Sequence, residues 1–126
     1  MSLKLIIFDL DGTLVDSKYD LTAAVNLTRK YYGLENISVS QVASYLGSGI
    51  KALVKNILPA VDQKELSDAV IMFKNFYSEH LLDTTKPYDG VVKMLESFKG
   101  IKKAVLSNKS ENFSKQILKE IGRAHV

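Results

Sequence analysis

The stretch FDLDGTLVDS, residues 8–17, follows a short aliphatic run, Leu5 to Ile7, close to the start of the chain. Aliphatic and β-branched runs of this length that end in polar residues are typical of buried strands. Two carboxylates, Asp9 and Asp11, stand two residues apart where this strand ends. A pair of acids in that position is either a polar strand end with its turn or one half of a functional site.

A second run of the same kind, KAVL at residues 103–106, is followed by Ser107 and Asn108. The chain between the two runs has helical periodicity, so the second strand should return to the sheet through a crossover helix and pair parallel to the first. Parallel strands bring their carboxyl ends to one edge, where open α/β sheets bind ligands. We therefore expect Asp9 and Asp11 to lie close to Ser107 and Asn108.

Apolar residues recur every three or four positions in several segments, and these segments predict helices. Polar residues that can cap a helix precede four of them. The predicted helices are 17–32, 40–47, 50–58, 62–81, 90–98 and 110–121, with caps from Asp16 or Ser17, Ser40, Asp62 and Ser110.

Bulk properties limit the classes of function. The 126 residues are 46% hydrophobic and 25% charged, as in one ordinary globular unit. The 17 basic and 14 acidic residues are spread along the chain, which argues against a nucleic-acid or membrane partner and indicates no oligomeric state. Cysteine is absent, which excludes disulfides and thiolate chemistry and favours a reducing compartment, by default the cytoplasm. No apolar run has the length of a signal-peptide core or a membrane span.

The expected cluster of polar residues suits phosphoryl transfer. A carboxylate such as Asp9 can attack phosphorus and form an acyl-phosphate, which divides one difficult displacement into two easier steps. Asp11 could protonate the leaving oxygen and then activate water for the second step. Because two carboxylates repel a phosphate dianion, a hard cation with oxygen ligands is needed, which indicates Mg²⁺. The phosphate would be surrounded by a sharp turn and by neutral donors: Gly12, Thr13, Ser107 and Asn108.

A simpler interpretation stays open beside this one. Asp11-Gly12 between two apolar runs is also a standard hairpin signal, with Asp9 as a polar strand end. Ser107-Asn108 after a strand is likewise a common way to open a loop. A hairpin, however, does not require a second strand ending in Ser-Asn after a helical insertion.

The stretch FDLDGTLVDS resembles the first motif of the haloacid dehalogenase-like hydrolase superfamily. AVLSNKS (104–110), with KPYDGVVKMLESFKG before it, resembles the second motif and its approach. The similarity, over about residues 3–121, is to the phosphoglycolate phosphatase and β-phosphoglucomutase-like group, in which a helical cap follows the first motif. It implies Asp9 as nucleophile and metal ligand, Asp11 as acid/base with its backbone carbonyl on Mg²⁺, and Ser107 with Asn108 on the phosphoryl group.

The resemblance extends to the inserted helices. YLGSGIKALVK (45–55) is similar to the cap segment that reaches over the active site in this group, which makes four of its residues candidates for substrate contact: Gly47, Ser48, Gly49 and Lys51. A solvated lysine is an equal alternative for Lys51. Lys109 could lie near the phosphate or on the surface. We expect Tyr19 to pack, and His80 and His125 to be structural or solvated.

The resemblance implies an α/β fold, in which an incomplete Rossmann-like parallel sheet core carries an inserted α-helical cap. Residues 1–15 and 86–126 would form the core and residues 16–85 the cap. A core of this size with two recognisable strands would bury little of its surface.

Two later features of the family do not occur in this sequence. Members normally continue with a lysine on a third strand region and with a fourth motif of acidic residues that complete the Mg²⁺ site. The last six residues, IGRAHV, have a back-translation that reads like a sequencing adapter. We therefore expect a truncated chain whose final residues are not native.

The sequence thus predicts a Mg²⁺-dependent phosphatase of a small phosphorylated metabolite, such as phosphoglycolate, that acts through an aspartyl-phosphate. The chain would be the N-terminal part of that enzyme. Two alternatives stay open: a catalytically inactive fragment or phosphate-binding module, and a sugar phosphomutase.

Overall fold

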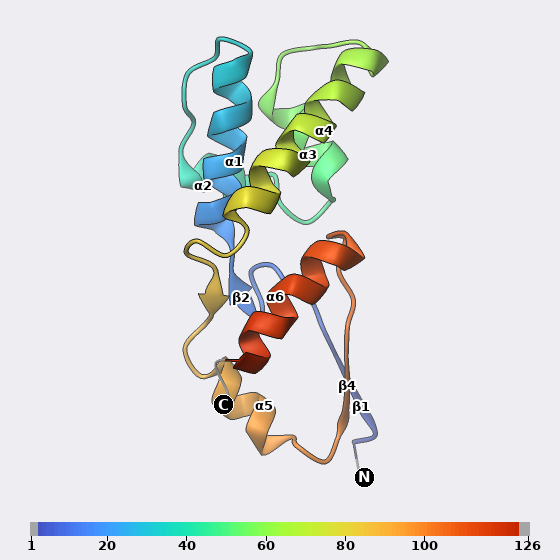
Figure 1. Ribbon diagram of the computed structural model, residues 1–126. Helices are drawn as coiled ribbons and strands as arrows, with labels where there is room; N and C mark the ends of the chain where they lie inside the picture. The colour runs from blue at the N-terminus through green and yellow to red at the C-terminus, as the bar shows by residue number, and fades with distance from the viewer. Residues whose placement is uncertain (1–2, 124–126) are drawn as a thin grey trace.

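The computed structural model describes residues 3–123 and has two parts (Figure 1). One part is the helical bundle, formed by α1 (Lys18–Tyr31), α2 (Val39–Ser44), α3 (Ile50–Ile57) and α4 (Gln63–His80). The other is the sheet unit, formed by β1 (Leu5–Phe8), α5 (Val91–Ser97), β4 (Lys102–Val105) and α6 (Glu111–Arg123). No helix within residues 3–123 is both long enough and apolar enough to cross a membrane.

The helical bundle is built around α1 and α4, which pack along each other. Asp62 is the N-cap residue of α4, and its Oδ1 accepts a hydrogen bond from the Glu65 amide at 2.8 Å, as the capping pattern predicted. The apolar faces of the helices meet in a buried core that includes Leu21, Ala24, Val25, Thr28, Leu53, Val54, Phe73 and Tyr77. This core continues into the sheet unit, since Phe113, Ile117 and Ile121 of α6 belong to the same buried cluster.

The expected cap of the second helix is wrong by two residues. Ser38, in an extended conformation, accepts the hydrogen bond from the Gln41 amide at 3.1 Å, and Ser40 lies inside α2. The helix also ends earlier than expected, at Ser44. Because both serines are capping residues, composition alone does not distinguish them.

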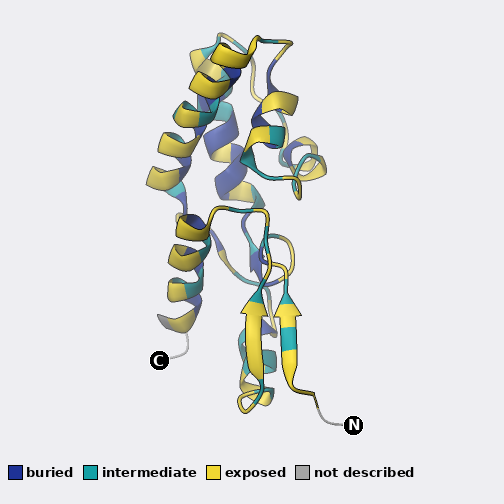
Figure 2. Ribbon diagram, turned by 90° about the vertical axis from the view of Figure 1, so that its right-hand side faces the viewer, coloured by how far each residue is buried: buried dark blue, intermediate teal, exposed yellow. Residues whose placement is uncertain are grey.

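The two predicted strands pair in parallel, as expected, in the register Leu5 with Lys102 to Phe8 with Val105. Phe8 and Val105 pack against the core, whereas Ile7 is 59% exposed on the opposite face. Figure 2 shows both strands uncovered towards the viewer. The expectation of fully buried strands is thus wrong for one face, because none of the described elements packs on it.

Two very short strands, absent from the prediction, join the parts. β2 (Val15–Asp16) pairs antiparallel with β3 (Lys86–Pro87). The hairpin alternative is wrong, because the chain turns at Gly12 (φ 79°) and continues into β2, which pairs with β3 and not with β1. Strands of two residues are too short to show a hydrophobic period, so sequence patterns miss them.

A buried carboxylate fixes the same junction. Asp20, in the first turn of α1, is 2% exposed. It accepts hydrogen bonds from the amides and hydroxyls of Thr84 and Thr85, at 2.7 to 3.0 Å. Because a buried carboxylate is stable only when its oxygens are satisfied, these bonds tie the segment before β3 to the start of α1.

Candidate active site

A cleft of about 380 Å³ lies where β1 and β4 end. Asp9 and Asp11, which follow β1, line it together with Ser107, Asn108 and Lys109, which follow β4. The parallel register explains this convergence, since it places both carboxyl ends at one edge. The facing wall comes from the helical bundle and consists of Leu21, Leu46, Gly47, Gly49, Ile50 and Leu53.

Asp9 is the more accessible of the two acids. Its Oδ1 accepts a hydrogen bond from the amide of Leu10 at 2.8 Å, while the residue is exposed. Its Oδ2 has no hydrogen-bond partner among the described residues. One oxygen is therefore held in place and the other is available to a ligand, which is the geometry that a nucleophile or a metal ligand needs.

Asp11 is held by two donors on the same oxygen. The Ser17 hydroxyl donates to its Oδ1 at 2.5 Å, and the Lys109 ammonium lies 3.2 Å from that atom. Ser17 is at the N-cap position of α1, but its side chain makes no capping hydrogen bond and donates to Asp11 instead. The predicted role of Ser17 as a side-chain cap is therefore wrong.

Lys109 is not a surface residue, so that alternative is wrong. Its side chain is 4% exposed, and its ammonium donates to the hydroxyl of Tyr77 and lies 4.3 Å from the centre of that ring. Burial lowers the pKa of Lys109, and the neighbouring Asp11 carboxylate opposes this shift. The contact with Tyr77 on α4 joins residues 32 positions apart, and no local pattern indicates it.

The Ser-Asn pair is also tied into its surroundings. The Ser107 hydroxyl accepts from the Lys109 amide at 3.1 Å, and the Asn108 amide nitrogen donates to the Gly47 carbonyl at 2.5 Å. Because a carboxamide has two N–H donors and a hydroxyl has one, each side chain keeps a donor for a ligand. Asn108 thereby connects the end of β4 to the loop before α3.

The structure separates some of the other candidates from the cleft. Gly12 and Thr13 form the turn after Asp11, where the Thr13 amide donates to the Leu10 carbonyl at 3.2 Å, and neither lines the cleft. Ser48 and Lys51 lie along an adjacent groove between α3 and α4. Of the four candidates from this segment, Gly47 and Gly49 line the cleft.

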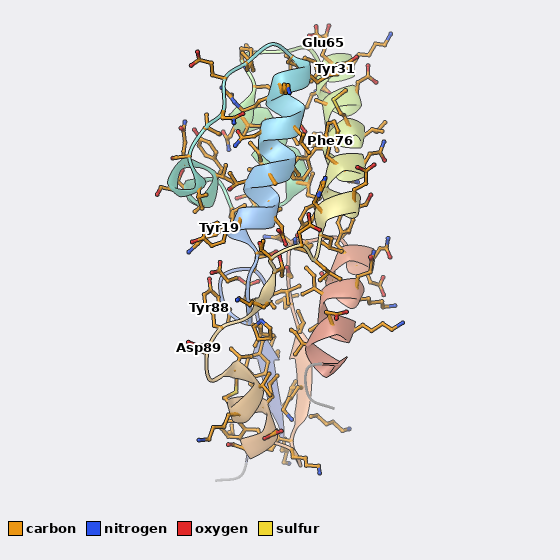
Figure 3. The ribbon with its side chains drawn as sticks, turned by 60° about the vertical axis from the view of Figure 1, so that its left-hand side comes forward. Tyr19, Tyr31, Glu65, Phe76, Tyr88 and Asp89 are labelled. Carbon is orange, nitrogen blue, oxygen red and sulfur yellow. The ribbon has the colours of Figure 1, made fainter. Side chains whose placement is uncertain are left out.

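Two residues outside the cleft test further expectations. Tyr19 is 50% exposed at the start of α1, so the expected packing role is wrong (Figure 3). His80 pairs with Asp83, with 2.6 Å between Nδ1 and Oδ2, which agrees with a structural or solvated role. His125 and the rest of the segment from Ala124 to Val126 lie outside the described residues.

The donor set of the cleft fits a magnesium ion that is shared with a ligand. Within residues 3–123 no group of three or more acidic, histidine or cysteine side chains converges on one point. Mg²⁺ is commonly held by one or two carboxylates, with phosphate oxygens and water in the other positions. Asp9, whose Oδ2 has no partner, and the nearby Asp11 satisfy that smaller requirement.

Comparison with known proteins shows that the chain is similar in sequence to several phosphatases. It is 41% identical over 118 residues to a phosphoglycolate phosphatase of Aquifex aeolicus, which covers 92% of this chain and 54% of the relative. It is 30% identical to an N-acetylmuramic acid 6-phosphate phosphatase of Pseudomonas aeruginosa, with coverage of 98% and 56%. The chain thus spans about half the length of the curated relatives it matches.

A solved structure and a family model extend the comparison to the fold and the family. The crystal structure of a predicted phosphoglycolate phosphatase from Haemophilus somnus superposes with a TM-score of 0.89 at 31% identity, over 98% of this chain and 59% of that one. The model of the haloacid dehalogenase-like hydrolases matches residues 6–126. The motif around Asp9 and Asp11, the fold and these matches agree, and the chain therefore belongs to the haloacid dehalogenase-like hydrolase family.

Proposed function

We propose that the cleft is the phosphoryl-transfer site of a phosphatase that acts on a small phosphorylated metabolite. The observation that carries the proposal is the pairing of two unequal carboxylates in one cleft. Asp9 has one oxygen without a partner, whereas Asp11 is held by a hydroxyl and an ammonium. Two carboxylates in different environments can take the two different roles that such a reaction requires.

The proposed reaction has two steps. In the first, Asp9 Oδ2 forms a bond to phosphorus, the bond from phosphorus to the leaving oxygen breaks, and Asp11 gives that oxygen its proton. In the second, Asp11 takes a proton from water, which attacks phosphorus and releases inorganic phosphate from Asp9. Ser107 and Asn108 would donate hydrogen bonds to the phosphoryl oxygens in both steps.

The metal would be held by Asp9 and by the backbone carbonyl of Asp11. When bound, Mg²⁺ would reduce the repulsion between the phosphate and the carboxylates of Asp9 and Asp11, and it would stabilise the negative charge that develops on the phosphoryl group. Lys109 adds a positive charge to the same wall of the cleft.

We also propose the division into core and cap. Residues 16–85 would act as a cap on a core of residues 1–15 and 86–126, with Gly47 and Gly49 closing the cleft and Ser48 and Lys51 contacting the distal part of a substrate. The paired strands β2 and β3, which stand at both junctions, support this division.

For the substrate we infer a compact phosphate ester such as phosphoglycolate. A cleft of about 380 Å³ is at the small end of ligand sites. The names of the matched relatives support the same class. A sugar phosphomutase would use the same nucleophile but return the phosphoryl group to the sugar, so release of inorganic phosphate distinguishes the two. The cytoplasmic location expected from the composition stays a prediction.

Hydrolysis of p-nitrophenyl phosphate with Mg²⁺ tests the proposal. We expect turnover by this chain and its loss, by about 10²-fold or more, in Asp9→Asn and in Asp11→Asn. Asp89→Asn is the matched control, because Asp89 is exposed and away from the cleft (Figure 3), and it should retain full activity. Equal rates in the native chain and Asp9→Asn would contradict the assigned nucleophile.

A phosphate-binding module is the second candidate, and one observation favours it. The described residues supply two acidic side chains to the cleft and no third metal-binding group near them. If that set is too small for catalysis, the chain would bind Mg²⁺ and phosphate in calorimetry without turnover. Binding that persists in Asp9→Asn and Asp11→Asn would contradict both candidates.

A further inference from the structure

A buried ammonium links the helical bundle to the acid/base candidate. Lys109 follows β4, Asp11 follows β1, and Tyr77 lies near the end of α4. The Lys109 Nζ contacts both the Tyr77 hydroxyl and Asp11 Oδ1, the latter at 3.2 Å. Three segments that are far apart in the sequence thus meet at one nitrogen atom.

The Tyr77 ring is fixed by its packing. It is fully buried, stacked on Phe73 with ring centres 5.8 Å apart, and in edge contact with Phe113 of α6 at 5.0 Å. Burial, with a smaller contribution from Asp11 and Asp20, raises the pKa of Tyr77, so its hydroxyl stays neutral. A lysine side chain is flexible, and a rigid acceptor together with the face of an aromatic ring restricts where its ammonium can lie.

We propose that Tyr77 is a positioning residue, which holds the Lys109 ammonium against Asp11 and thereby lets the helical bundle set the orientation of that carboxylate. The role of Asp11 in catalysis rests on the proposed function, whereas the link itself does not.

The orientation matters because Asp11 has two oxygens and one proton to transfer. Ser17 and Lys109 both contact Oδ1, and Oδ2 has no hydrogen-bond partner among the described residues. The link therefore leaves the second oxygen for the leaving group or for water. Removal of the Tyr77 hydroxyl should release Lys109 and let the carboxylate rotate, although Tyr77 makes no direct hydrogen bond to Asp11 in the described structure.

A triple-mutant box in urea unfolding tests the link without any assay of activity. The substitutions are Tyr77→Phe and Asp11→Asn, combined in the native chain and in a Lys109→Met background. We expect the two changes to be non-additive when Lys109 is present and additive when it is replaced. Additive effects in both backgrounds, or equal coupling in both, would overturn the proposal. Tyr88→Phe is the matched control and should be additive with Asp11→Asn throughout.

Steady-state kinetics with p-nitrophenyl phosphate distinguish positioning from a general loss of structure. Tyr77→Phe and Lys109→Met should lower kcat about tenfold to 10²-fold with KM changed less than about twofold, because a misplaced group mainly affects the chemical step. Lys109→Arg, which keeps the charge, should recover part of the loss. A rise in KM at unchanged kcat would overturn the positioning role. If the native chain shows no turnover, the proposed function fails, and the mutant box still decides the link.

Discussion

The helical bundle and the sheet unit differ in how completely they are packed. In the bundle, α1 and α4 bury a common apolar core on their facing sides. In the sheet unit, β1 and β4 have one strand partner each among the described residues, and Leu5 and Ile7 are exposed on the open face. The more weakly packed part therefore carries the candidate catalytic residues, and the better packed part faces them across the cleft.

This difference indicates that contacts from the helical bundle hold the side chains of the cleft in place. Three contacts pass from the bundle side to the cleft: Ser17 to Asp11, Tyr77 to Lys109, and the Gly47 carbonyl to Asn108. A two-stranded sheet alone is marginal in water. We therefore expect substitutions in the bundle to disturb the whole chain, and substitutions on the open sheet face to have little effect.

The largest effect is expected for Phe73→Ala in the bundle core. Phe73 is fully buried and stacked on Tyr77, so truncation leaves a cavity and should lower the free energy of unfolding by about 3–5 kcal/mol. Urea unfolding followed by circular dichroism measures the change. Ile71→Ala, on the exposed side of the same helix, is the control and should change it by less than about 0.5 kcal/mol. Similar losses for both would show that the bundle lacks the packed core described above.

The next effect is expected at the junction between the two parts. Asp20→Ala removes the acceptor for the amides and hydroxyls of Thr84 and Thr85. It should lower the free energy of unfolding by about 3 kcal/mol, because the donors of the buried Thr85 lose their partner. Hydrogen exchange at these two amides should accelerate strongly. Asp83→Ala, which removes an exposed acid paired with His80, should have a much smaller effect. Unchanged exchange in Asp20→Ala would mean that β2 and β3 hold the junction without it.

A smaller effect is expected for Ser17→Ala. The substitution removes one donor from Asp11 and should lower the free energy of unfolding by about 1 kcal/mol. Ser78→Ala, which loses only a bond to the carbonyl of Asn75 on the exposed side of α4, is the matched control. If the two variants unfold alike, the Ser17 contact does not contribute to the order of the site.

The smallest effect is expected on the open face of the sheet. Ile7→Ala should change the free energy of unfolding by less than about 0.5 kcal/mol, although Ile7 lies in a strand, because its side chain is mostly exposed. Ile57→Ala in the bundle, a buried residue of the same type, should cost about 2–5 kcal/mol. A cost for Ile7→Ala close to that of Ile57→Ala would show that this face is covered in solution.

The sequence predicted the elements that have a clear period and a clear chemistry. The longer helices, both strands of the parallel pair and the meeting of Asp9 and Asp11 with Ser107 and Asn108 follow from hydrophobic periodicity and from one topological rule. The sequence did not predict β2 and β3, which are too short for a period, or the bonds of Asp20 to Thr84 and Thr85, which connect positions 64 and 65 residues apart.

Lys109 and Ser17 show the same limit within the site. Local patterns would explain Lys109 as a surface lysine at the start of a helix and Ser17 as a helix cap. In the structure both side chains contact Asp11 instead. Tertiary contacts decide between such alternatives, since the competing partners are not neighbours in the sequence.

The most direct test of the central claim is to detect a phosphorylated Asp9. The chain would be mixed with Mg²⁺ and phosphoglycolate that is radiolabelled in its phosphoryl group, quenched in acid, and assayed for label on the protein. We expect label on the native chain and none on Asp9→Asn, because only a carboxylate at this position can form the acyl-phosphate. Absence of label from the native chain, or equal label on Asp9→Asn, would contradict the assignment of Asp9 as the nucleophile.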